Sequence, residues 1–364
     1  MAMPGSPVGN GEVLFFIPDI GGFTKFVSET EIRHSQHIIQ ELLELLVDAN
    51  NLGLEVAEFE GDAVLFVRSG APPSVDALIE QARAMFVAFH AHLQRIEYYR
   101  VCQCGACSTA SSITLKIVAH AGSAGTMKVK DHRKFIGKDI IVAHRLLKNS
   151  VPTREYLLVT QATLDRVGAA SDALGEFAGG SNAYDELGDI PYRYKPLDGY
   201  LSDVKVDPPK PFSLENPVRV LRLEQRVNAP ADRVYQLLID LPARMQWIAG
   251  IKSVQMADNQ PNHIGKVHRC ISEGGGDPEL VTSAIEVRPE TMALWETDVG
   301  KRAACSYLVT RLPDAASEIA VEFYLQGNAL VRLLFKAFAQ PKLKARFEQS
   351  LRKLASICEA APAA

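Results

Sequence analysis

The chain has 364 residues, of which 47% are hydrophobic and 23% are charged, and its formal net charge is −4. This length is long for one hydrophobic core and comfortable for two domains. The small negative charge gives no general attraction to nucleic acid or to an anionic membrane, and no apolar run approaches the length of a membrane span.

The first twelve residues, MAMPGSPVGNGE, are expected to form a flexible N-terminus. They contain neither the basic nor the apolar segment of a secretory signal, so none is predicted. Six cysteines in so long a chain do not make a disulfide framework. The cytoplasm is therefore the expected compartment.

A buried strand is predicted over residues 12–20, EVLFFIPDI, from its length and continuous apolar character. Asp19 lies at the end of this run, and Gly21 and Gly22 follow it. A carboxylate at a strand end can hold a divalent cation, and bare backbone beside it lets N–H groups approach a phosphate. Taken alone, the motif is explained more simply by a strand that ends at a turn, where Asp and Gly are common.

A second aspartate has a similar position. An amphipathic helix is predicted over residues 30–51 with Thr30 as its N-cap, and two short strands over residues 54–67 turn at Gly61 and Asp62. Two carboxylates on adjacent strands are what a two-metal phosphoryl-transfer site requires, with the ions about 3.5–4 Å apart. The two motifs in this order favour a functional site.

Three cysteines follow a further predicted helix at residues 74–97. Cys102, Cys104 and Cys107 surround a glycine in VCQCGACS, and such a cluster resembles part of a structural zinc site. No fourth ligand is close in the sequence, so His120, another cysteine or a second copy of the chain are the candidates. The alternative is a loop of unliganded thiols.

The rest of the first half alternates between strand and helix. A strand is predicted over residues 112–122 and a helix over residues 139–150, which indicates an α/β or α+β domain. The basic run KVKDHRKF, residues 128–135, is either a solvated hairpin or a surface that meets a triphosphate.

A linker is predicted at residues 201–216, because the stretch from Pro196 to Pro217 contains five prolines and little apolar content. It separates a first domain at residues 13–200 from a second at residues 217–360.

The second half opens with a strand and the helix ADRVYQLLID, for which Pro230 suits the first turn. Five strand-like runs follow between residues 265 and 325, and the half closes with a long helix that has one apolar face. This order predicts an α+β domain with room for a cavity between the sheet and the helix.

Several motifs of the first half resemble those of class III adenylate and guanylate cyclases. FFIPDIGGFTKF resembles the first metal motif of that family, and EGDAVLFV resembles the second. LKIVAHAGSAG, IGKDIIVAHRLL and YDELGDIPYRY resemble later elements of the same domain. The resemblance covers residues 13–200 and implies a ferredoxin-like α+β cyclase-type domain.

The resemblance also implies the roles of particular residues. Asp19 and Asp62 would bind two Mg²⁺ or Mn²⁺ ions with help from the Ile20 carbonyl, and Arg145 would stabilise charge on the phosphoryl group. The backbone around three residues would hold the triphosphate: Gly22, Phe23 and Thr24. The site of such cyclases forms between two catalytic domains, so a homodimer is expected. The reaction would convert a purine nucleoside triphosphate into a 3′,5′-cyclic nucleotide and pyrophosphate.

The sequence departs from the family pattern in the part that reads the nucleotide. Ile141 stands where the family has a transition-state asparagine, and isoleucine cannot donate a hydrogen bond. Glu58 and Lys134 occupy the positions of the base-selecting pair, but they match neither base cleanly and could simply form a salt bridge. Glu60 adds a carboxylate near Asp62, or else belongs to an exposed strand face.

Residues 217–360 resemble the helix-grip, START-like fold of the SRPBCC or polyketide cyclase type, which implies a cavity for a small apolar ligand. Five aromatic residues are candidates to line it: Trp247, Trp295, Phe323, Tyr324 and Phe338. His263, His268 and Glu273 form no nucleophile–base arrangement, so no catalysis is predicted here.

Two functions follow from these patterns. The first is a divergent, metal-dependent nucleotidyl cyclase that is coupled to a domain binding a small apolar ligand. The alternative is a catalytically silent homologue that acts as a metal- and nucleotide-binding sensor, or as a carrier of a lipid or metabolite.

Overall fold

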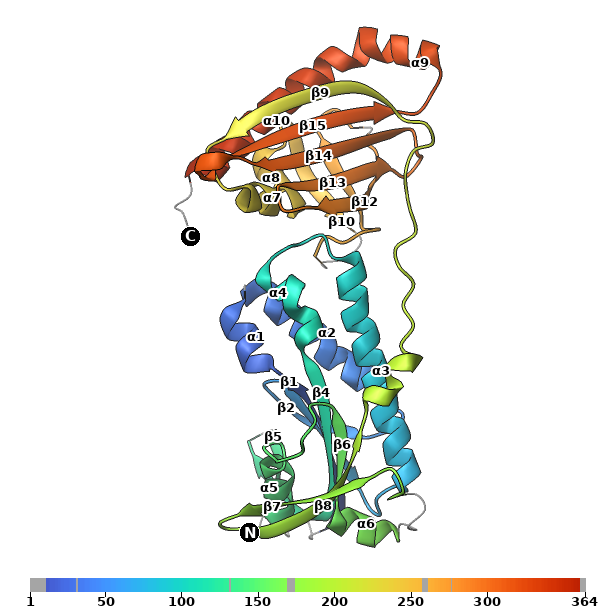
Figure 1. Ribbon diagram of the computed structural model, residues 1–364, viewed down its shortest axis with the longest axis vertical. Coiled ribbons are helices and arrows are strands. Elements are labelled where there is room, and N and C mark those ends of the chain that lie inside the picture. Colours follow the sequence, from blue (N-terminus) through green and yellow to red (C-terminus); the bar gives the residue numbers. More distant parts are fainter. Residues whose placement is uncertain are drawn as a thin grey trace, which may run out of the picture. The chain divides into compact units, whose positions relative to one another are not determined.

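The computed structural model describes residues 11–30, 32–130, 132–168, 174–256, 261–275 and 277–360. The chain divides into two compact units (Figure 1). The first comprises Met1–Glu97 and Cys104–Asp207, and the second comprises Tyr98–Gln103 and Pro208–Ala364. Among the helices of the described ranges, none combines the length and the apolar character needed to span a bilayer.

The first unit is built on a mixed sheet of eight strands in the order β2-β3-β1-β4-β6-β8-β7, with β5 paired to β4. Every pair is antiparallel except β4 with β6. The strands are β1 (Gly11–Gly21), β2 (Glu55–Glu60), β3 (Ala63–Ser69), β4 (Thr114–Val129), β5 (His132–Ile136), β6 (Tyr156–Thr160), β7 (Ala178–Tyr184) and β8 (Gly188–Pro196). The helices are α1 (Phe23–Glu29), α2 (Ile32–Asp48), α3 (Val75–Tyr99), α4 (Gly105–Thr109), α5 (Lys138–Arg145) and α6 (Gln161–Val167), with short 3₁₀ turns at Ala110–Ser112 and Asp198–Asp203.

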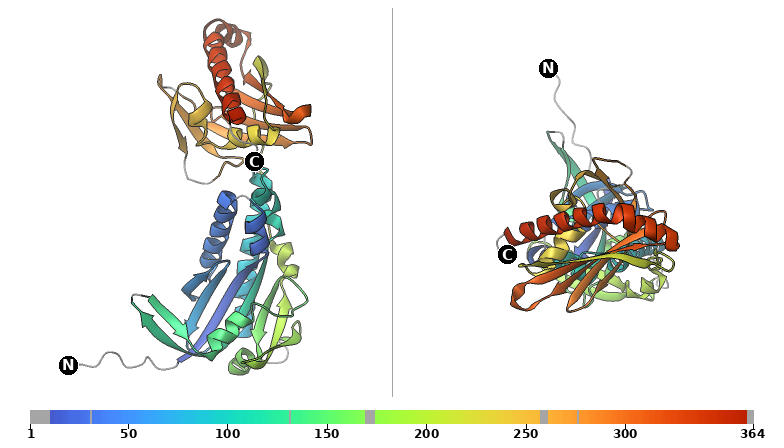
Figure 2. Two further views of the ribbon diagram at one scale, coloured as in Figure 1. Left: turned by 90° about the vertical axis from the view of Figure 1, so that its left-hand side faces the viewer. Right: turned by 90° about the horizontal axis from the view of Figure 1, so that it is seen from above.

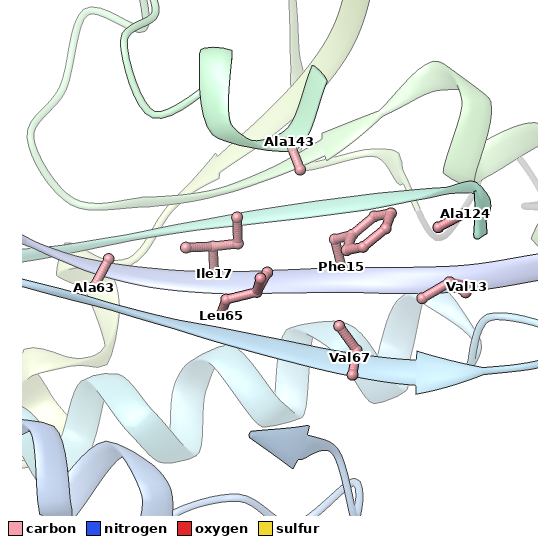
Figure 3. Packing of buried hydrophobic residues seen from close by; sticks show 8 residues of the cluster. All are labelled: Val13, Phe15, Ile17, Ala63, Leu65, Val67, Ala124 and Ala143. Atoms are coloured by element: carbon pink, nitrogen blue, oxygen red, sulfur yellow. The ribbon is translucent and has the colours of Figure 1, made fainter. Parts of the chain in front are cut away.

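One face of this sheet packs against α5. Figure 3 shows Val13, Phe15 and Ile17 of β1 in a row, with Ala143 of α5 above them. Leu65 and Val67 of β3 and Ala124 of β4 complete the cluster. Because side chains alternate along a strand, the next residue of the same row of β1 is Asp19. The hydrophobic core therefore leads directly to the carboxylate.

The strands and helices predicted in the first unit are present, but α5 ends at Arg145 rather than at residue 150, and the start of α2 also differs. Thr30, the predicted N-cap of α2, is the C-cap of α1, and its hydroxyl donates to the Phe26 carbonyl oxygen. The helix α1 itself was not predicted, because seven residues are too few to show a helical period.

The second unit is a curved antiparallel sheet in the order β10-β11-β12-β13-β14-β15-β9. Its strands are β9 (Val218–Val227), β10 (Ile251–Met256), β11 (Val267–Ser272), β12 (Leu280–Val287), β13 (Thr291–Asp298), β14 (Ala303–Arg311) and β15 (Ser317–Leu325). Its helical segments are α7 (Ala231–Ile239), α8 (Arg244–Trp247), a 3₁₀ turn at Pro313–Ala315, α9 (Ala329–Leu334), a π-helical turn at Phe335–Ala339 and α10 (Gln340–Ala360).

The long helix α10 lies along one face of this sheet, as the views in Figure 2 show. Leu351, Leu354 and Cys358 are buried on its inner side, and α10 also contacts α7 and α8. This arrangement is the helix-grip form, so the predicted α+β class is confirmed for both units.

Candidate functional site

Asp19 and Asp62 lie next to each other at one end of the first unit's sheet. Asp19 pairs with Ala63 across β1 and β3, and the Ile20 N–H donates to the Asp62 carbonyl oxygen at 3.0 Å. Asp19 is buried and Asp62 is half-buried. Burial raises the pKa of both carboxyl groups, and the charge of Asp62 raises the pKa of Asp19 further. Two neighbouring carboxylates that are costly to ionise are stabilised by a cation between them.

Lys116 of β4 supplies one positive charge to this pair. It lies directly opposite Asp19, with its Nζ 3.2 Å from Oδ2, and it donates to the Leu147 carbonyl at 2.8 Å. Its charge lowers the pKa of Asp19 and so opposes the larger effect of burial. Sequence analysis missed this residue, although a lysine inside the apolar run 112–122 was a visible signal.

The two glycines after Asp19 allow close packing and a tight turn of the backbone. At Gly21 a Cβ atom would lie 2.3 Å from the Thr114 Oγ1, so a larger residue would force the Thr114 side chain to move. Gly22 has φ of 85°, in the left-handed region that favours glycine, and it forms the N-cap of α1. The chain can therefore turn tightly from Asp19 into Phe23 and Thr24, the first residues of α1.

A cavity of about 720 Å³ borders this turn. The lining includes Gly21, Gly22 and four basic residues, and no acidic residue is among the described residues that line it. The basic residues are Lys25, Lys116, Lys148 and Arg154. Six residues that carry a hydroxyl group also line it: Thr30, Thr109, Ser112, Thr114, Thr153 and Tyr156. A cavity of this composition suits an anion that is rich in oxygen atoms.

The residues expected to recognise the base and to stabilise the transition state do not line this cavity. Arg145 is exposed in the last turn of α5 and is not among the residues that line this cavity, while Ile141, one turn earlier, is 50% exposed. Glu58 and Lys134 form an exposed ion pair with 3.2 Å between Oε1 and Nζ. Glu60 pairs with His144 of α5 at 3.0 Å. The salt-bridge alternative for Glu58 and Lys134 is thus the one that the structure contains.

Three cysteines in α4 and just before it gather around a histidine. The ligand atoms of Cys102, Cys104, Cys107 and His34 all lie within 4.8 Å of one another. The His34 Nδ1 is 3.2 Å from the Cys104 Sγ and 3.4 Å from the Cys107 Sγ. With Zn–S bonds of about 2.3 Å and Zn–N bonds of about 2.0 Å, tetrahedral ligands lie roughly 3.5–3.8 Å apart, so the spacing fits zinc.

His34 is a candidate fourth ligand that sequence analysis did not identify, because it precedes Cys104 by 70 residues. His120, the histidine considered there, is buried elsewhere: its Nδ1 is 2.8 Å from the Thr160 hydroxyl and its Nε2 is 3.3 Å from Asp139. The cluster of His34, Cys102, Cys104 and Cys107 is a candidate zinc site.

A zinc content of one ion per chain is expected, measured by mass spectrometry of metals after purification. His34→Ala and Cys104→Ser each remove one ligand and should lose the ion during dialysis against a mild chelator. His37→Gln is the matched control, because His37 lies on the same helix and pairs with Glu41 instead. A metal-free wild type, or variants that keep full zinc content, would contradict the assignment.

The second unit contains a cavity of about 280 Å³ between its sheet and α10. Trp247 and Phe323 line it, but the structure places Trp295, Tyr324 and Phe338 outside its lining. Trp295 and Tyr324 pack on each other with ring centroids 5.4 Å apart, and Phe338 is 75% exposed. The reason is that side chains alternate along a strand. Glu296 lies next to Trp295 and Phe323 lies next to Tyr324, and these two neighbours line the cavity.

Two residues that line this cavity, Arg244 and Glu296, belong to a buried ionic cluster. The Arg244 guanidinium donates to both oxygens of Glu296, at 2.6 and 3.1 Å, and the Nε2 of His268 lies 2.9 Å from Arg244 Nη1. All three side chains are 1% exposed or less. Burial alone would raise the pKa of Glu296, but Arg244 and His268 lower it to about 2. The pair of Arg244 and Glu296 therefore stays charged at neutral pH.

Comparison with known proteins separates the two units. Residues 39–156 match a family model described as protein of unknown function (DUF2652), and residues 219–359 match one described as polyketide cyclase / dehydrase and lipid transport. The chain is similar to the uncharacterized protein Rv2561/Rv2562 of Mycobacterium tuberculosis, with 36% identity over 120 residues. That match covers 33% of this chain and 56% of the relative, so it spans little more than half of that protein.

Solved structures of cyclases are similar to this chain at low identity. The guanylyl cyclase domain of the RhoGC fusion protein from the aquatic fungus Blastocladiella emersonii is 22% identical, with a TM-score of 0.35, and the match covers 51% of this chain and 96% of that domain. The adenylyl cyclase CyaB from P. aeruginosa is 16% identical, with a TM-score of 0.34 and coverage of 51% and 94%. The match to the polyketide cyclase / dehydrase and lipid transport family covers the curved sheet and the long closing helix of the second unit.

Proposed function

We propose that the first unit binds a purine nucleoside triphosphate together with Mg²⁺ or Mn²⁺, with Asp19 and Asp62 as the cation ligands. One observation carries this proposal: Asp19, which feels the charge of Asp62, pairs with Lys116, and Lys116 is one of four basic residues that line the cavity. The cation would satisfy the carboxylates, and the basic lining would neutralise the phosphates. The triphosphate would lie against the backbone that starts at Gly22.

Turnover to a 3′,5′-cyclic nucleotide is the second candidate function. The exposed position of Arg145 at the end of α5 favours it, since the side chain is available to a second copy of the chain in a homodimer. The ion pair of Glu58 with Lys134 and the isoleucine at position 141 oppose it, because the groups that would read the base and hold the ribose are occupied or missing. We therefore propose that the first unit binds the nucleotide and converts little of it into a cyclic nucleotide.

For the second unit we infer a binding role for a small ligand in the cavity beside α10. The lining includes Trp247, Tyr307, Phe323 and Phe347, so most of the ligand surface would meet apolar groups. The whole chain would then be a ligand-responsive nucleotide-binding protein.

Titration calorimetry of the full chain with ATP and with GTP, each with Mg²⁺ or Mn²⁺, tests the first role. Binding is expected, and Asp19→Asn or Asp62→Asn should weaken it at least about 10-fold, because each removes a charged ligand of the cation. Asp165→Asn, an exposed aspartate of α6, is the matched control. The proposal is rejected if neither nucleotide binds, or if the Asp19 and Asp62 variants bind like the control.

The variant Lys116→Met distinguishes the binding of the metal from the binding of the phosphates. Lys116 competes with a cation for Asp19, yet it adds positive charge to the cavity. The variant should therefore bind Mn²⁺ alone more tightly and the nucleotide more weakly. A change of the same sign for both ligands would mean that Lys116 does not link them.

A further inference from the structure

The cavity of the second unit is not uniformly apolar. Trp247 is 1% exposed, and its indole N–H has no hydrogen-bond acceptor among the described residues. Its ring meets Tyr307 edge to face, with centroids 6.4 Å apart. A buried donor without an acceptor costs free energy, so a bound molecule that accepts from it is favoured.

Arg346 of α10 brings a positive charge to the same lining. Its Nε donates to the Ala249 carbonyl oxygen at 2.9 Å, close in the chain to Trp247. Within the part of the chain that the structure describes, no carboxylate lies within 4.0 Å of its guanidinium nitrogens. The terminal N–H groups of this half-buried side chain are thus available to a ligand.

The carboxylates that line the cavity are already satisfied by the protein. Glu296 is held by Arg244, as described above. Asp298 accepts from the backbone N–H groups of Arg302 and Ala303, and Asp277 accepts from the backbone N–H and the hydroxyl of Ser272. The hydrogen-bonding capacity that remains is therefore mainly that of donors, and it favours an acceptor with negative charge.

We propose that this cavity takes a compact monocarboxylic acid with an apolar body, whose carboxylate accepts hydrogen bonds from Arg346 and Trp247. The assignment rests on the ligand-binding role inferred above for the second unit and names the chemical class of the ligand. The volume of about 280 Å³ is slightly below the range of roughly 300–1,000 Å³ that drug-sized ligands occupy, so it suits one small acid and excludes a two-chain lipid.

A matched pair of probes tests the carboxylate: 4-phenylbutyrate and 4-phenylbutanol. The full chain would carry Trp295→Phe, which leaves Trp247 as the single tryptophan and makes its fluorescence report the cavity. The acid is expected to bind about 10- to 100-fold more tightly than the alcohol, the range given by a hydrogen bond to a charged group. Arg346→Gln should remove this preference, and Arg346→Lys should keep part of it.

Lys344→Gln is the control, because Lys344 lies on the same helix and is exposed. Circular dichroism would show that each variant is folded. If the alcohol binds as tightly as the acid, and Arg346→Gln changes neither, the cavity takes a neutral ligand and the carboxylate assignment is overturned. If neither probe binds to the folded protein, the assignment falls together with the ligand-binding role itself.

Discussion

Replacement of Glu296 by glutamine is expected to lower the free energy of unfolding of the second unit by about 3–5 kcal/mol, the usual cost of leaving one partner of a buried ion pair unpaired. Glu296 and Arg244 are each 1% exposed and bonded through both carboxylate oxygens. The glutamine would keep the shape and leave the guanidinium buried without a counter-charge. The chain's two tryptophans, Trp247 and Trp295, both lie in this unit, so the denaturant dependence of their fluorescence measures its unfolding.

The matched control is Glu322→Gln on the same sheet. Glu322 pairs with Arg219 and Arg222, which are 52% and 41% exposed, so its loss should cost about 1 kcal/mol or less. Arg244→Met combined with Glu296→Leu removes both charges and should be more stable than either single variant. Equal losses for Glu296→Gln and Glu322→Gln would show that burial does not set the strength of this pair.

The same pair predicts how the second unit responds to acid. The pKa of Glu296 is about 2 in the folded protein, below its ordinary value of 4.5. A carboxyl group whose pKa is lowered by folding stabilises the fold above its unfolded pKa, and this stabilisation is lost as the pH falls through the folded pKa. Stability should therefore fall between about pH 4.5 and pH 2 in the wild type, and Glu296→Gln should lack this part of the acid dependence.

The strands and long helices could be predicted because their signal is local. The apolar run 12–20 and the helical spacing in residues 30–51 and 74–97 each indicate an element by themselves. The short helix α1 carries no such period. The prediction of the cavity lining was partly wrong for another reason. The sequence suggests that Trp295 faces the cavity, but in the structure its neighbour Glu296 does. The acid faces inward because it meets Arg244, 52 residues away, and that contact exists only once the sheet has formed.

The same distinction applies to the sites. Asp19 and Asp62 could be named as candidates because each lies within two residues of a glycine at a strand end. Lys116 and His34 could not, since their roles come from neighbours that the fold brings close. Lys116 meets Asp19 through the pairing of β1 with β4, and His34 meets the cysteines from a helix that lies 70 residues earlier.

Ile141→Asn is expected to raise the rate of cyclic nucleotide formation by at least about 10-fold over the wild type, if Asp19 and Asp62 hold the metal–nucleotide complex as proposed. A single well-placed donor to a transition state is worth about 10²–10³ in rate, and position 141 is where cyclases of the resembled family carry an asparagine. The side chain of Ile141 is 50% exposed on α5, one turn before Arg145, so the substitution should cost little stability.

Ile141→Ala is the control for side-chain size. It shortens the side chain without adding a hydrogen-bond donor, so it shows whether any gain in rate comes from the asparagine amide. Cyclic nucleotide from ATP and from GTP would be quantified with Mn²⁺, and the variant Asp19→Asn in the Ile141→Asn background would show whether any new product depends on the metal site. Equal rates for Ile141→Asn and Ile141→Ala would mean that the missing donor is not what limits turnover. The ion pair of Glu58 with Lys134 would then be the remaining obstacle, since it occupies the two groups expected to read the base.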